Sequence, residues 1–144
     1  MQKNRAIIVS YLIDTNVISE LIKAQPDKQV VKWFSAVPDC NLYLSVLSLG
    51  EIRKGLIKLD DAVKREKIRL WLEHELTEWF DDRILSIEHD VANKWGLLQA
   101  QTKRTLSAID SLIAATALHS DLILVTRNTK DFEYPALEVI NPFL

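Results

Sequence analysis

The sequence predicts an α/β fold, a three-layer α/β/α sandwich with a mostly parallel sheet. Short apolar runs alternate along the chain with longer segments whose apolar residues recur at helical spacing. Most strand candidates are separated by such helical segments, which are the crossovers that parallel strands require. The chain has 144 residues, of which 48% are hydrophobic and 26% charged, as expected for one globular domain. We therefore expect a single domain over residues 1–144, with residues 1–5 loose.

The first half of the chain is expected to contain two strands and four helices. Apolar spacing identifies the helices, and Asp60 and Asp61 supply a cap before the longest of them. In chain order we expect a strand at 11–13 that could begin as early as Ile7, a helix at 16–23, a short helix at 30–37, a buried strand at 41–45, a helix at 46–59 and a long helix at 62–80.

The second half repeats the alternation. The run at 122–126 is the clearest buried strand, because it is apolar from Leu122 to Val125. The helix before it is rich in alanine, which permits close packing against a neighbouring element. The expected elements are a strand at 83–87, a helix at 90–102, a helix at 107–119, the strand at 122–126 and a last strand at 137–140.

Composition restricts the location and partners of the protein. The single cysteine, Cys40, forms no internal disulfide and belongs to no metal-binding pattern, which favours a reducing, cytoplasmic compartment. No apolar stretch is long enough to span a membrane, so no membrane association is expected. The net charge of −2 does not by itself indicate a nucleic-acid binder, and any basic surface must be local.

Four carboxylates occupy the places where separate apolar segments end or turn: Asp14, Glu51, Asp110 and Asp131. Each has an ordinary structural explanation, as a helix cap, a solvated helix residue, an acid in a first helical turn and a turn residue respectively. Sites in parallel sheets form outside the carboxyl ends of the strands, and all four acids map to that edge. A cluster of carboxylates there would suit a hard divalent cation such as Mg²⁺. The chemistry that this predicts is metal-assisted hydrolysis of a phosphodiester.

The segments around these acids resemble the four signatures of PIN-domain ribonucleases, most closely the VapC toxins of type II toxin–antitoxin pairs in their FitB-like branch. The signatures read LIDTNVIS at 12–19, SLGEIRKG at 48–55, IDSLIAATA at 109–117 and LVTRNTKDF at 124–132. The resemblance extends from Tyr11 to Pro142. One departure is Ser120–Asp121, where relatives often carry a glycine.

The resemblance implies that the four acids hold Mg²⁺ or Mn²⁺ and are catalytic, with Asn16, Thr126 and Asn128 as supporting polar residues. It implies a parallel α/β/α sandwich, and endonucleolytic cleavage of structured RNA such as tRNA or ribosomal RNA. It also implies a cognate antitoxin as the protein partner. Among the basic residues, Arg53, Arg127 and Lys130 are the candidates for RNA binding; the lysines and arginines at 64–69 are better explained as a solvated helix face. The apolar stripe within 62–80 is a candidate surface for a homodimer or for the antitoxin.

Other functions remain open at this point. A non-catalytic binding module would keep the fold without the chemistry, and a DNA-acting nuclease would use the same acids, because the cluster does not read a 2′-hydroxyl. A signalling receiver domain also carries an acidic Mg²⁺ pocket on a parallel sheet. It is disfavoured because only one acid, Asp14, follows the first strand and Arg127 stands where a lysine is needed. No glycine-rich phosphate loop is present.

Overall fold

The computed structural model describes residues 8–104 and 107–144. Its centre is a five-stranded sheet in which every strand is parallel to its neighbours, in the order β3-β2-β1-β4-β5. The strands are β1 (Tyr11–Ile13), β2 (Leu42–Ser45), β3 (Ile84–Leu85), β4 (Ile123–Val125) and β5 (Val139–Ile140). The predicted α/β sandwich is confirmed. The expectations for residues 1–5 and for a strand start at Ile7 lie outside the described residues.

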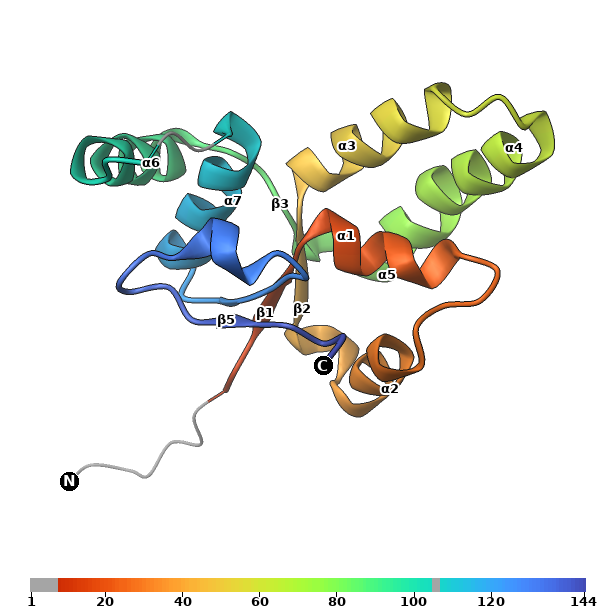
Figure 1. Ribbon diagram of the computed structural model, residues 1–144, viewed down its shortest axis with the longest axis horizontal. Helices are drawn as coiled ribbons and strands as arrows, with labels where there is room; N and C mark the ends of the chain where they lie inside the picture. Colours follow the sequence, from red (N-terminus) through yellow and green to blue (C-terminus); the bar gives the residue numbers. More distant parts are fainter. Residues whose placement is uncertain (1–7, 105–106) are drawn as a thin grey trace.

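Helices cover both faces of the sheet and complete the three layers (Figure 1). One layer consists of α6 (His89–Gln101), α7 (Ala108–His119) and the short turn η5 (Thr129–Phe132). The opposite layer consists of α1 (Thr15–Ile18), η1 (Ser19–Ile22), α2 (Lys28–Ala36), α3 (Val46–Ile57), α4 (Ala62–Leu70), η3 (Trp71–Leu76) and α5 (Thr77–Phe80). Among the described residues, no helix is both long and apolar enough to cross a membrane.

The core lies on both sides of the sheet because successive strand residues point to opposite faces. Ile13 and Val125 pack with the first layer of helices, whereas Leu12 and Leu124 pack with α6 and α7. All four are at most 1% exposed. Strands covered on both faces need apolar residues at every position, which explains the continuous apolar runs in the sequence.

The long helix expected over 62–80 forms, but its middle is π-helical. Asp61 caps α4 by accepting from the N–H groups of Val63 and Lys64. The π-helical segment η3 then connects α4 to α5 without a break. Its wider turn buries the consecutive residues Trp71 and Leu72 together with Leu76. Much of the apolar stripe within 62–80, a candidate partner surface in the sequence, is therefore part of the core.

The connection before β4 has a left-handed residue. Asp121, in the turn for which the resemblance implied a glycine, has φ of 54°. Aspartate adopts this conformation more readily than most residues, though less readily than glycine. The departure noted in the sequence thus affects a strained turn at the amino end of β4.

Strand order places one particular edge at the centre of the molecule. From β1 the chain moves to β2 and β3 on one side, and then returns to β4 and β5 on the other. The carboxyl ends of β1 and β4 are therefore neighbours at the point where the order reverses, which is where open α/β sheets bind ligands. Asp14 follows β1 and Thr126 follows β4 at this edge.

Candidate functional site

Asp14 is the buried centre of the site. Its backbone N–H continues the sheet by donating to the Val125 carbonyl over 2.9 Å. Its carboxylate is held from two sides: Oδ1 accepts from the backbone N–H of Thr15 at 2.8 Å, and Oδ2 accepts from Thr126 Oγ1 at 2.7 Å. The residue is only 6% exposed. Asp14 stands before the first turn of α1, so the cap explanation is partly correct, but a cap does not require a hydroxyl from a strand 112 positions away.

Thr126 connects the predicted supporting residues. Its buried hydroxyl accepts from Asn16 Nδ2 at 3.4 Å and from the backbone N–H of Asn128 at 3.1 Å while it donates to Asp14. Asn16 Oδ1 in turn accepts from the backbone N–H of Arg127 at 3.2 Å. The structure therefore brings Asn16, Thr126 and Asn128, the supporting polar residues that the resemblance implied, into one network around Asp14.

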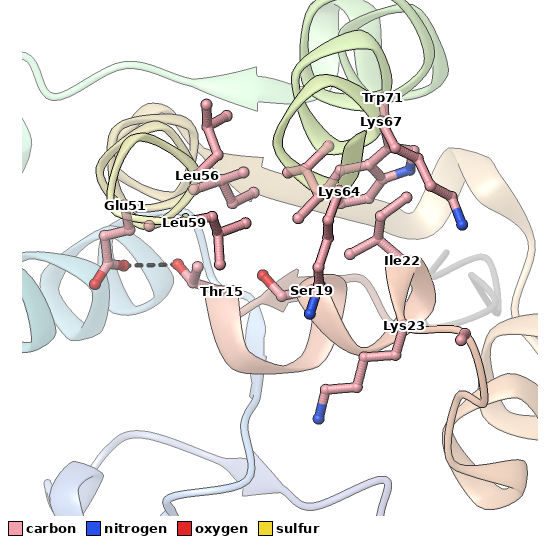
Figure 2. A pocket seen from close by; sticks show the side chains of 14 residues that line it. Thr15, Ser19, Ile22, Lys23, Glu51, Leu56, Leu59, Lys64, Lys67 and Trp71 are labelled. Carbon is pink, nitrogen blue, oxygen red and sulfur yellow. Dashed lines mark hydrogen bonds between the residues drawn. The ribbon is translucent and has the colours of Figure 1, made fainter. Parts of the chain in front are cut away.

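Glu51 reaches the same edge from α3. Thr15 Oγ1 donates to Glu51 Oε1 at 2.6 Å (Figure 2). Thr15 Oγ1 is also hydrogen-bonded to Ser48 Oγ at 2.8 Å. Thr15 also gives its backbone N–H to Asp14, so a single residue connects the first two acids. The sequence analysis did not single out Thr15 or Ser48. The available signal was spacing, because Ser48 lies one helical turn before Glu51 on the same face.

Asp110 completes the group from the opposite layer. It lies in the first turn of α7, where its backbone N–H donates to the capping Ser107 Oγ at 3.1 Å, and it is half-buried. The helix dipole favours an acid in the first turn of α7, and this position does not prevent Asp110 from taking part in the predicted site.

Electrostatics shows that the three acids share one environment. Burial raises the pKa of Asp14 from its ordinary value of 3.8 to about 6. The hydrogen bonds from Thr126 and Thr15 oppose this rise in pKa, and the negative charges of Asp110 and Glu51 add to it. The negative charges of Asp110 on α7 and Glu51 on α3 therefore act on Asp14, which follows β1.

Asp131 is placed differently. It is exposed on η5, its backbone N–H donates to the Asn128 carbonyl at 3.0 Å, and its charge is not among those that shift the pKa of Asp14. Within residues 8–104 and 107–144, no three His, Cys, Asp or Glu side chains converge tightly enough to hold one ion as they stand. The structure thus brings three predicted acids into electrostatic contact and leaves the fourth at the rim.

The donor set at this edge suits a hard divalent cation. All of its ligand atoms would be carboxylate oxygens, which Mg²⁺ and Mn²⁺ prefer. Each Asp14 oxygen accepts one hydrogen bond and so retains a lone pair. A buried carboxylate with two acids beside it is unfavourable without a counter-charge, and a bound cation would relieve both burial and repulsion.

The three basic candidates point to different places. Arg53 turns toward η3, where Nη1 lies 3.7 Å from Glu73 Oε2, so it is not brought to the acids. Arg127 and Lys130 are exposed beside the Thr126 network, and neither forms an ion pair with any other residue in the described part of the chain. The Lys130 carbonyl accepts from Arg104 Nη1 at 3.1 Å, which ties η5 to the segment before α7.

A pocket of about 560 Å³ opens next to the acids between η1, α3 and α4 (Figure 2). Thr15 and Glu51 form one end. Its apolar wall includes Ile52, Leu56 and Trp71, and Lys64 and Lys67 extend over it from α4. The sequence analysis treated these lysines as part of a solvated face. They are exposed, but they border a pocket that is continuous with the acid site.

Comparison with known proteins agrees with the geometry. The family model described as PIN domain matches residues 11–136. The chain is 36% identical to VapC ribonuclease Y4jK of Sinorhizobium fredii over 92% of this chain and 96% of that protein. It is 33% identical to toxin FitB of Neisseria gonorrhoeae over 92% of this chain and 97% of that protein.

A solved structure of FitAcB from Neisseria gonorrhoeae superposes with a TM-score of 0.87 at 33% identity, and covers 92% of this chain and 98% of that one. The structure of FitAB bound to a DNA fragment gives a TM-score of 0.85 at 31% identity, over 93% of this chain and 96% of that one. The matched segment contains Asp14, Glu51, Asp110 and the turn with Asp131. This chain belongs to the PIN-domain family, and its relatives there include VapC ribonuclease and toxin FitB.

Proposed function

We propose that the protein is a Mg²⁺- or Mn²⁺-dependent endoribonuclease that acts as the toxin of a type II toxin–antitoxin pair. The observation that carries this proposal is the buried Asp14 carboxylate at the switch point of the sheet, with its pKa raised by burial and by the neighbouring Asp110 and Glu51. A carboxylate in this state is suited to a cation and unfavourable without one. Family membership supports the assignment, because relatives bear the names ribonuclease and toxin.

In the proposed mechanism, Asp14, Glu51 and Asp110 would hold the cation, and Asp131 would contribute from the rim. The chemistry that a divalent ion would supply there is Lewis-acid polarisation of the scissile phosphodiester and a lower pKa of a water at the site. Thr126 and the Thr15 backbone fix the orientation of the Asp14 carboxylate, and the Thr15 hydroxyl fixes Glu51. These contacts hold the acids in place before substrate arrives, which limits the reorganisation that catalysis would need.

The proposed substrate is structured RNA, with tRNA or ribosomal RNA as the expected classes. Arg127, whose backbone N–H joins the Asn16 and Thr126 network, and Lys130, which precedes Asp131 in the chain, are exposed and offer cations to phosphate groups. Phosphate contacts position a strand without reading its sequence, so the target sequence is decided elsewhere. A DNA-acting nuclease and a non-catalytic binding module remain the alternatives, and the assay below separates them.

The test is cleavage of labelled tRNA, ribosomal RNA fragments and single- and double-stranded DNA in Mg²⁺, in Mn²⁺ and in chelator. We expect cleavage of RNA only when a metal is present, and its loss in Asp14→Asn and Asp110→Asn. Asp82→Asn is the matched control, because Asp82 is an exposed aspartate outside the site. Cleavage that survives chelator would refute the metal dependence; cleavage of DNA alone would favour the alternative nuclease, and no cleavage under any condition the binding module.

An antitoxin is the proposed protein partner, since a solved structure from Klebsiella pneumoniae that is 28% identical to this chain is described as a toxin–antitoxin complex. The pocket beside Glu51 supports this, because it combines an apolar wall with exposed lysines and opens next to the acids. A partner seated there would restrict access to the site. Co-expression with the product of a short adjacent gene should yield a stable complex that does not cleave RNA, and Leu59→Glu in the pocket should weaken that complex.

We further propose a homodimer and a cytoplasmic location. Two apolar side chains that stay exposed at the connection between α3 and α4 support self-association, Ile57 at 65% and Val63 at 82%. Light scattering of the purified protein across a concentration series tests this proposal. A mass equal to one chain at all concentrations would contradict it.

A further inference from the structure

Arg127 is an exposed cation that the fold holds in place at three points. Its backbone N–H donates to Asn16 Oδ1 at 3.2 Å, and its carbonyl accepts from Asn141 Nδ2 at 3.4 Å. Its guanidinium carbon lies 4.5 Å from the centre of the Phe143 ring. The same Asn141 accepts from the Phe143 backbone N–H at 2.9 Å through Oδ1. The segment after β5 therefore carries both the ring and the amide that fix Arg127.

This arrangement differs from that of other arginines whose partners are visible in residues 8–104 and 107–144. Arg69 is bound by Glu66 and Glu73. Arg83 also lies over an aromatic ring, that of Phe80, but its N–H groups donate to three backbone carbonyls. Arg127 lies against an aromatic face and has no carboxylate partner in the described chain. A guanidinium placed over a ring keeps its N–H edges available, and those edges match a phosphate in a bidentate way.

The position of Arg127 in the fold also fixes it relative to the acid site. Arg127 directly follows Thr126, which hydrogen-bonds Asp14, and it shares Asn16 with that network. Phe143 in turn packs against the core cluster on the α1 side of the sheet. The cation is thus fixed relative to the acids by the sheet and by the core. Ordering a flexible arginine side chain costs rotamer entropy, and the contact with Phe143 meets part of that cost before a ligand arrives.

We infer that Arg127 is the preorganised phosphate contact that positions the nucleic-acid strand at the acid edge, and that Phe143 and Asn141 are positioning residues acting through it. The inference rests on the proposed function for the identity of the strand as RNA. It also predicts an unequal contribution from the three basic candidates, because Arg53 is directed to Glu73 and Lys130 has no aromatic support in the described structure.

The test measures affinity in chelator, so that binding is separated from cleavage. A fluorescein-labelled RNA hairpin is titrated with the protein from 50 to 300 mM salt. Arg127→Ala should weaken binding about five- to tenfold and reduce the slope of log K against log salt by about one. Phe143→Leu keeps an apolar side chain and should weaken binding about threefold, whereas Phe143→Trp should retain it because a ring is restored.

A double-mutant cycle separates positioning from general stability. If Phe143 acts through Arg127, adding Phe143→Leu to Arg127→Ala should change affinity no further. Equal losses from Phe143→Leu in both backgrounds would overturn the positioning role. Arg69→Ala is the matched control, an arginine already neutralised by two carboxylates, and should bind as the wild type does.

Cleavage kinetics distinguish the failure of this inference from failure of the proposed function. With Mg²⁺ present, Arg127→Ala should raise KM and leave kcat at saturating RNA nearly unchanged. Wild-type cleavage together with unchanged affinity and unchanged salt slope in Arg127→Ala would overturn the inference and leave the nuclease assignment intact. A wild type that neither binds nor cleaves RNA would overturn both.

Discussion

Replacing Asp14 by asparagine should stabilise the metal-free protein at neutral pH. The wild-type carboxylate is 6% exposed, and burial together with the charges of Asp110 and Glu51 raises its pKa to about 6. The folded protein therefore binds this proton more tightly than the unfolded chain does. Between pH 3.8 and about 6 the unfolded state carries fewer protons, so the free energy of unfolding falls as pH rises through that window.

The size of the effect follows from the two pKa values. A rise from 3.8 to about 6 corresponds to about 3 kcal/mol at about 1.4 kcal/mol per pKa unit. The amide removes this penalty but fits the network less well. Thr126 Oγ1 accepts from Asn16 and Asn128 and donates its proton to Asp14. If the new amide pointed an N–H at Thr126 Oγ1, the Thr126 hydroxyl proton would lose its acceptor, at a cost of about 1 kcal/mol.

Because the two effects have opposite signs, the stability curves of the wild type and Asp14→Asn should cross as pH changes. Above pH 7 in chelator, Asp14→Asn should be more stable than the wild type by about 1–2 kcal/mol, or about 3–7 °C in Tm for a chain of this size. At pH 4 the wild-type carboxyl is protonated in the folded state, and the variant should be less stable by about 0.5 kcal/mol, a difference that approaches about 1 kcal/mol at lower pH. The curves should cross near pH ~4.5.

Denaturant unfolding at a series of pH values, followed by tryptophan fluorescence, measures the difference. Because the other carboxylates titrate in both proteins, the difference curve isolates Asp14. Asp82→Asn should run parallel to the wild type. Adding MgCl₂ should raise the Tm of the wild type and have little effect on Asp14→Asn. Curves that stay parallel from pH 4 to pH 8, or equal Mg²⁺ shifts in both proteins, would refute the reasoning.

Four further changes test other parts of the structure. Thr126→Val removes the hydroxyl that donates to Asp14, and should lower kcat at least tenfold and the free energy of unfolding by about 1–3 kcal/mol, measured by cleavage assay and denaturant titration. Thr15→Val separates Glu51 from the network and should reduce activity with only a small loss of stability; unchanged activity would show that this contact is incidental. Leu76→Ala opens a cavity at a residue that is 0% exposed and should cost about 2–5 kcal/mol, with activity retained in the fraction that stays folded. Asp121→Gly relieves a left-handed φ of 54° and should raise stability by about 0.5–1 kcal/mol; a loss on calorimetry would mean that the aspartate makes a compensating interaction.

The order and type of the elements were predictable because they depend on local patterns. The buried strand β4 shows this best, since a run of apolar residues identifies a doubly covered strand without reference to its neighbours. The π-helical segment η3 was not predictable. It is needed because Trp71 and Leu72 are consecutive and both buried, and that demand arises only when α4 and α5 pack on the sheet.

Some residues of the candidate site were likewise predictable from the sequence, and others were not. Asp14, Glu51 and Asp110 were identified from their places at the ends of apolar segments, and the structure brings their charges together. Thr15 was missed because its role is a contact with α3, 36 positions away. Arg53 and Arg127 were both candidates in the sequence, but Arg53 faces Glu73 and Arg127 lies on Phe143. Side-chain direction decides between them, and sequence spacing does not contain it.

The sequence by itself determined the alternation of strands and helices, the apolar positions that form the core, and which carboxylates stand at strand and helix ends. Periodicity contains this information because it acts over a few residues. Only the tertiary structure decided that β4 lies beside β1, and hence that Thr126 reaches Asp14 and that Arg127 stands next to the acids. Strand order, and hydrogen bonds between residues more than a hundred positions apart, depend on how the layers pack against one another. That packing forms cooperatively over the whole domain and is not contained in any short segment.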